Sequence, residues 1–263
     1  MELSDVLNGK EVKHEGGYFY SIERNIEELP IKRLTSAIKL GYPSINPSVL
    51  AQTFPVYSHQ SMEDIPPRHL VEKALFIDIE TRGLAHRHPI FLISLGQYSE
   101  EGMKITSVLA RDYSEERTML SYFLQLLHNS TSQITFNGHR FDLPHIGRRA
   151  QHQGLMINGY RYRELAEVLR GTHTDLIDHF NGKLQDIEKL RFGFARRGDI
   201  PGAAIPEIYR NYVYGLGDQD EVVQQIKSIV LHNMVDVASI GALFADRCRE
   251  SAEENLLTRS LAA

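Results

Sequence analysis

The segment 74–84, ALFIDIETRGL, constrains the fold more than any other part of the chain. A hydrophobic run at 74–77 leads directly into two carboxylates, Asp78 and Glu80, with one residue between them. The run predicts a buried strand, and residues two apart on a strand face the same side. Because burying two like charges together is costly without a compensating positive charge, the chain must bring other groups to the end of this strand.

The remaining pattern predicts a mixed sheet flanked by helices. Two further strands follow the first with short connections, which favours an antiparallel arrangement of the three. A helix, a strand, a second helix, a fifth strand and further helices come next, and this order resembles the ribonuclease-H-like topology. We therefore predict an α/β fold with a five-stranded sheet, three antiparallel strands followed by parallel ones. The predicted strands are at 73–80, 89–98, 103–111 and 132–136, and the segment 172–180 predicts a fifth strand or a strand-to-helix junction. The predicted helices are at 114–129, 142–154, 184–194 and 218–251, the last as one long helix or two in sequence, and the proline-containing segment 199–215 becomes helical after its first residues.

Composition changes near residue 70 and predicts how the chain is divided. The segment 42–69 carries five prolines and predicts an extended arm or linker. We expect residues 1–70 to form a small N-terminal extension and linker, 71–250 the main domain and 251–263 a C-terminal tail. The first residues lack the apolar core of a signal peptide, the chain has one cysteine, and we saw no apolar run near the roughly 18 residues of a membrane span. These features predict a cytoplasmic protein that has no membrane partner.

Further acids occur at comparable places in the pattern. Asp142 begins a predicted helix after the fourth strand, and His232 and Asp236 are four residues apart, on one face of a predicted helix. Together with Asp78 and Glu80, the four carboxylates come from three segments that can meet beside one strand. Mg²⁺ and Mn²⁺ prefer oxygen ligands and would supply the missing positive charge. Two such ions about 4 Å apart can assist displacement at a phosphodiester, and a nearby His can position the attacking water.

At these residues the chain resembles the DEDD 3'-5' exonuclease superfamily, also called DnaQ-like. FIDIETRGL at 76–84 is similar to its first motif, FNGHRFDLP at 136–144 to its second and HNMVD at 232–236 to its third. More narrowly, the chain resembles the YprB-like ribonuclease-H-fold proteins. The resemblance implies that Asp78, Glu80, Asp142 and Asp236 bind two Mg²⁺ or Mn²⁺ ions. Its subtypes place a His five residues before the last Asp or a Tyr four before it, whereas here His232 lies four before.

The same resemblance implies a substrate and the residues that contact it. The substrate would be the 3' end of single-stranded DNA or RNA, hydrolysed one nucleotide at a time. Thr81, Gly83 and Leu84 lie where the family cradles the terminal nucleotide. Asn137 and Phe141 lie where it contacts the penultimate one.

The sequence leaves several alternatives open. Asp142 could be only a helix cap and His232 a surface histidine, while Asp175 more simply has a structural role near the sheet end. Arg191, Arg196 and Arg197 could grip phosphates or form a solvated helix end. The protein could also be a catalytically weak nucleic-acid-binding module or a structure-specific endonuclease. DNA and RNA are not distinguished. The net charge of −5 argues only against non-specific coating of nucleic acid.

Overall fold

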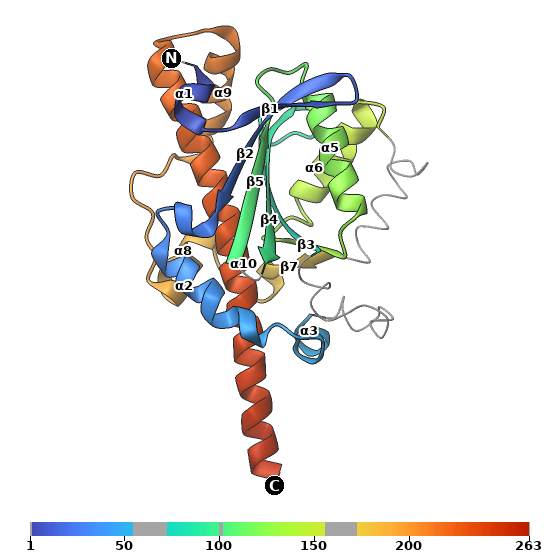
Figure 1. The fold of residues 1–263 in the computed structure, drawn as a ribbon, viewed down its shortest axis with the longest axis vertical. Coiled ribbons are helices and arrows are strands. Elements are labelled where there is room, and N and C mark those ends of the chain that lie inside the picture. Colours follow the sequence, from blue (N-terminus) through green and yellow to red (C-terminus); the bar gives the residue numbers. More distant parts are fainter. Residues whose placement is uncertain (1, 55–72, 100–101, 156–172, 263) are drawn as a thin grey trace.

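A seven-stranded mixed sheet forms the middle of the molecule, with helices on both of its faces (Figure 1). The computed structural model describes residues 2–54, 73–99, 102–155 and 173–262. The strands are β1 (Lys10–His14), β2 (Gly17–Asn25), β3 (Ala74–Thr81), β4 (Ile90–Ser99), β5 (Gly102–Leu109), β6 (Ser132–Thr135) and β7 (His173–Asp175).

The sheet order is β1-β2-β5-β4-β3-β6-β7. The strands from β1 to β3 in this order pair antiparallel, whereas β6 and β7 continue the sheet in parallel with β3. This confirms the predicted mixed α/β architecture. The predicted count of five strands was too low, because the N-terminal segment adds a hairpin: β2 pairs with β5 from Tyr20↔Leu109 to Asn25↔Lys104. The hairpin covers an edge that β5 would otherwise present unpaired.

Helices of unequal size cover the two faces. On one face, α5 and α6 contribute to an apolar cluster with the side chains of Leu75, Ile77 and Ile79 from β3. On the other, α10 crosses the sheet together with α2, α3, α8 and α9. The helices are α1 (Leu3–Leu7), α2 (Lys32–Gly41), α3 (Pro47–Thr53), α5 (Glu116–His128), α6 (Asp142–His152), α8 (Leu184–Phe192), α9 (Ile205–Tyr214) and α10 (Gln219–Ala262).

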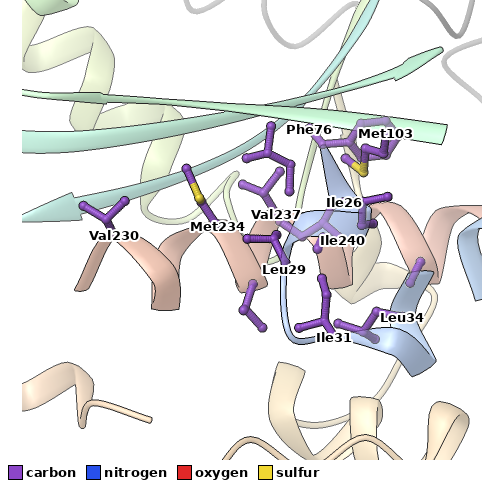
Figure 2. Close-up of a cluster of buried hydrophobic side chains, with 14 of the residues drawn as sticks. Ile26, Leu29, Ile31, Leu34, Phe76, Met103, Val230, Met234, Val237 and Ile240 are labelled. Atoms are coloured by element: carbon purple, nitrogen blue, oxygen red, sulfur yellow. The ribbon is translucent and has the colours of Figure 1, made fainter. Parts of the chain in front are cut away.

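The helix α10 is the central support of its face. It is a single helix of 44 residues that runs along the long axis of the molecule (Figure 1). Figure 2 shows Val237 and Ile240 of α10 gathered with Phe76 of β3, Met103 of β5 and residues of the N-terminal segment. By length and composition, Gln219–Thr258 could cross a membrane, contrary to our sequence reading. However, 78% of its apolar window is buried within the protein, and this packing accounts for its apolar character.

The N-terminal segment is built into the same core. Gly41 at the end of α2 lies so close to α10 that an added Cβ would stand 2.5 Å from the carbonyl oxygen of Ala245. Part of the proline-containing segment predicted as extended is helical, since α3 occupies Pro47–Thr53. The predicted boundary near residue 70 lies outside the described residues. The predicted tail at 251–263 continues α10 as far as Ala262.

Candidate active site

The strand β3 presents its two acids toward α10. Along the strand, Leu75, Ile77 and Ile79 join the apolar cluster beneath α5 and α6, whereas Phe76 joins the cluster beneath α10. Asp78 and Glu80 follow Phe76 at intervals of two, so they face the same side as Phe76. They lie near the carboxyl end of β3, where a register shift between Glu80 and Thr81 ends the regular pairing with β4.

The helix α6 brings the third acid to this end of the sheet. Because β6 runs parallel to β3, the carboxyl ends of both strands lie at the same edge. The loop after β6 leads to Asp142, the first residue of α6, which is only 7% exposed. Asp142 is therefore more than an exposed helix cap. Burial raises the pKa of this carboxyl, and the backbone amides of Asp142 and Ile79 oppose the rise, which places the carboxyl beside β3.

The helix α10 supplies the remaining groups. The Nε2 atom of His232 lies 3.3 Å from Oδ2 of Asp236 and 4.0 Å from Oε1 of Glu80. One ligand atom from each of Glu80, His232 and Asp236 fits within 4.8 Å of the others. The neighbouring Asn233 donates a hydrogen bond from its side-chain amide to Asp78. The structure thus brings all four predicted carboxylates and His232 together.

Burial of these acids shifts their protonation. Desolvation raises the pKa of Asp78 and of Glu80 well above the ordinary value, and the charges of Asp236 and Asp142 raise both further. Burial raises the pKa of Asp142 to about 7. Burial also raises the pKa of Asp236, although Arg196 and His232 oppose the shift. The surrounding protein therefore does not fully stabilise the four carboxylates when all of them are ionised.

One fixed cation, Arg196, partly compensates the cluster. Its guanidinium donates hydrogen bonds to Asp236 and to Glu188 of α8, and its side chain is only 6% exposed. Burial lowers the pKa of Arg196, but the hydrogen bond to Glu188 and the charge of Asp236 hold it above the ordinary value. Neither interpretation of Arg196 from sequence, a phosphate contact or a solvated helix end, describes this ion pair.

The donor set fits divalent metal ions. Four carboxylates with raised pKa values face one another, and oxygen donors of this kind suit Mg²⁺ or Mn²⁺. The side-chain oxygen of Asn233, beside Asp78, is buried and has no hydrogen-bond partner within the described part of the chain. Asp78, Glu80, Asp142 and Asp236 are the residues that would hold the metal, because a bound cation would offset the negative charge that Arg196 compensates only in part.

Sequence reasoning missed Asp199 as a member of this site. Its Oδ1 atom lies 2.7 Å from Nδ1 of His232, on the opposite side of the ring from Glu80 and Asp236. Asp199 also accepts a hydrogen bond from Arg196 and another from Gln185. It is 33 residues from His232 in the chain. No local spacing rule therefore links the two residues, and only the path of the loop between α8 and α9 reveals the contact.

Thr81, Gly83 and Leu84 lie where β3 ends and the following loop begins, at the same sheet edge. The hydroxyl of Thr81 donates to the carbonyl of Gly83 at 2.8 Å, which tightens the chain just beyond β3. Gly83 lies against the ring of His88, where an added Cβ would be 3.0 Å from a ring carbon. Leu84 projects into solvent with 84% exposure. Leu84 lies three residues beyond the end of β3, and its contact with substrate remains a prediction.

Asp175 holds the start of the loop that carries Asn137 and Phe141, the two residues from the second motif. Asn137 adopts a positive φ of 62°, and its backbone amide donates to Asp175 at 2.6 Å. The amide of His139 donates to the same carboxylate at 2.9 Å, so the structural role expected of Asp175 is confirmed. Phe141 is half-buried, with its ring centroid 5.2 Å from that of His145. Asn137 and Phe141 therefore lie on the loop that leads to Asp142, and their contacts with substrate remain a prediction.

Comparison with known proteins identifies the family. The RNase H superfamily matches residues 75–246, which contain the four acids and His232. The chain therefore belongs to the RNase H superfamily. This membership supports a nuclease that hydrolyses nucleic acid, and RNase H-like nucleases generally use divalent metal ions.

One solved structure and a search of curated proteins add detail. The family B DNA polymerase from the hyperthermophilic archaeon Pyrobaculum calidifontis is similar with a TM-score of 0.49 and 18% sequence identity. The alignment covers 65% of this chain and 24% of the polymerase. The chain thus spans about a quarter of that protein's length. No curated protein matches this sequence.

Proposed function

We propose that the protein is a metal-dependent 3'-5' exonuclease of the DEDD type, within the YprB-like group, acting on single-stranded nucleic acid. The observation that carries the proposal is the convergence of Asp78, Glu80, Asp142 and Asp236 beside His232. The acids come from three separate elements, and their order along the chain is that of the DEDD motifs. The family match supports the nuclease class, while the acids and their arrangement support the narrower assignment.

The roles of the residues follow from their positions. The four carboxylates would hold two Mg²⁺ or Mn²⁺ ions, which when bound activate water and stabilise the leaving 3' oxygen. The exposed Leu84 and the loop carrying Asn137 and Phe141 would position the last nucleotides at the same sheet edge. His232 would orient the attacking water or accept its proton at Nε2, the nitrogen on the side of Glu80 and Asp236.

Asp199 fixes which ring nitrogen of His232 is available. When its carboxylate accepts the Nδ1 proton, Nε2 carries the free lone pair in the neutral ring. Replacing Asp199 with Asn should weaken this orientation and lower kcat roughly 10- to 100-fold, with KM little changed. Steady-state kinetics on a short oligonucleotide would measure the change. The matched control is Asp186→Asn, an exposed acid on α8. An equal decrease of kcat in both variants, or a change in KM with kcat unaltered, would contradict the role of Asp199.

The direction of digestion tests the proposed function itself. The purified protein is incubated with a 5'-labelled single-stranded oligonucleotide and Mn²⁺, with and without chelator. A 3'-5' exonuclease gives a ladder of progressively shorter labelled products, and the chelator abolishes it. Discrete internal cuts would instead establish an endonuclease, and binding without cleavage would establish a catalytically weak binding module. Parallel DNA and RNA substrates report the preferred sugar.

A further inference from the structure

A cleft borders the candidate active site on the side of α10. It has a volume of about 410 Å³, and His232, Asp199 and Arg196 form part of its wall. Residues 30–31 of the N-terminal segment, and residues 194–198 of the loop that carries Arg196, complete the lining. The cleft therefore begins at the groups that contact the catalytic carboxylates and extends away from them.

A second cleft is lined by residues that neighbour those of the first in the sequence. It has a volume of about 530 Å³ and lies between α2, the end of α8 and α10. Lys32 and Arg33 line it directly after residues 30–31 of the first cleft, and Phe192 lines it two residues before Phe194. A guanidinium nitrogen of Arg33 donates to the carbonyl of Phe192 at 3.3 Å, which joins the two segments that line the second cleft. Figure 1 shows α2 and α8 together beside α10.

The two clefts are basic in a protein that is acidic overall. Their lining contains two acids, Asp199 and Asp246, whereas the chain as a whole has a net charge of −5. Six cationic side chains line the clefts: Lys32, Arg33, Arg191, Arg196, Arg197 and Arg249. This concentration of positive charge beside a carboxylate cluster is directed toward an anionic ligand.

Three of these cationic side chains are not paired with an acid of the described residues and can bind an anionic ligand. Arg191 and Arg249 are paired with acids of α10, and Arg196 with Asp236 and Glu188. Lys32, Arg33 and Arg197 are exposed, and none forms an ion pair with another described residue. They occur along both clefts, Arg197 in the first and the other two in the second.

The clefts also offer apolar surface between the charges. Phe192 and Phe194 are half-buried on adjacent walls, and Leu40 is 71% exposed at the second cleft. Alternating cations and apolar side chains are what a single nucleic-acid strand requires, with its regularly spaced phosphates and stackable bases. Each cleft has a volume in the range of roughly 300–1,000 Å³ that is typical of pockets for small molecules. A cleft of this size can hold a nucleotide unit of a single strand, whereas a duplex is too wide for it.

We propose that the two clefts form a track for single-stranded nucleic acid, holding its phosphodiester backbone as it passes from the catalytic carboxylates across α10 toward α2. This inference rests on the proposed nuclease function and adds where the rest of the strand binds. It also gives the N-terminal segment a function, because residues 30–33 line both clefts. An acidic protein partner could use the same cations, but the first cleft is lined by His232 and Arg196, which contact the catalytic carboxylates, and this position favours the strand.

The test compares binding of 12-nucleotide and 4-nucleotide oligothymidylates by fluorescence anisotropy, in EDTA so that hydrolysis does not interfere. The double variant Lys32→Ala/Arg197→Ala should bind the 12-nucleotide strand roughly tenfold more weakly than wild type. Its slope of log K against log salt should fall in magnitude by about 1.4, since each single-strand phosphate contact contributes about 0.7. The control Lys10→Ala/Lys13→Ala removes the same charge from exposed positions on β1 and should bind as wild type does.

Each outcome distinguishes the track from the proposed function. Unchanged affinity and salt slope in Lys32→Ala/Arg197→Ala would overturn the track, even if wild type digests the oligonucleotide in Mn²⁺. The predicted loss of binding, together with no digestion by wild type in Mn²⁺, would support the track and overturn the exonuclease proposal. Equal competition by polyglutamate of the same charge would overturn the assignment of the track to nucleic acid.

Discussion

Replacing Asp78 with Ala should lower the rate of phosphodiester hydrolysis by roughly a thousandfold or more, a loss of about 4 kcal/mol in transition-state stabilisation. Burial raises the pKa of Asp78, and the charges of Asp236, Asp142 and Glu80 raise it further, so its carboxylate interacts with all three of the other acids. Removing it therefore takes away an oxygen donor that interacts with every other acid of the cluster. The measurement is the rate of product release from a labelled oligonucleotide at saturating Mn²⁺.

The fold should survive this change. Asp78 contributes repulsion in the metal-free protein, and the apolar residues before it on β3 fix the strand independently. Thermal unfolding followed by circular dichroism would check this point. The control is Glu207→Ala, which removes an exposed carboxylate on α9 whose side chain is 72% accessible and should leave the rate unchanged. Metal-dependent digestion that persists at the wild-type rate in Asp78→Ala would sink the assignment of the active site.

The sequence predicted the parts of the site that depend on local geometry. The two-residue spacing of Asp78 and Glu80 sets their common face on β3, and the four-residue spacing of His232 and Asp236 sets theirs on α10. The unusual position of His232 relative to the family pattern does not remove it from the site, because α10 continues unbroken through 232–236. In a helix or a strand, the number of residues between two side chains determines whether they point to the same face.

The parts that were missed depend on long-range packing. The pairing of β2 with β5 joins residues more than 75 positions apart, and no local spacing in the sequence indicates it. Arg196 and Asp199 reach Asp236 and His232 from an irregular loop, where spacing does not fix side-chain direction. The charges that balance the catalytic acids therefore became visible only with the structure.

Stability of the metal-free protein should depend on pH through the same acids. Their folded-state pKa values are raised, so between about pH 4 and pH 7 the folded protein binds more protons than the unfolded chain. The stabilising contribution of the protonated acids is therefore present at low pH and is lost as pH rises through this window. The upper end of the window is set by Asp142, whose pKa is raised to about 7. Mn²⁺ or Mg²⁺ should restore stability above pH 7, where the ionised carboxylates can bind metal, and should have little effect near pH 4.

The variant Asp142→Asn isolates this contribution, because it keeps the size of the side chain and removes its titration. Without metal at pH 8 it should be more stable than wild type by roughly 2 to 4 kcal/mol, the cost of ionising a carboxyl whose pKa is raised by about three units. The difference should disappear near pH 4, and Mn²⁺ should stabilise the variant much less than wild type. Chemical denaturation at several pH values measures both effects, with Glu207→Gln as the control. A stability difference that is independent of pH would show that ionisation of Asp142 does not destabilise the folded protein. Equal stabilisation by Mn²⁺ in both proteins would show that metal binding does not require its carboxylate.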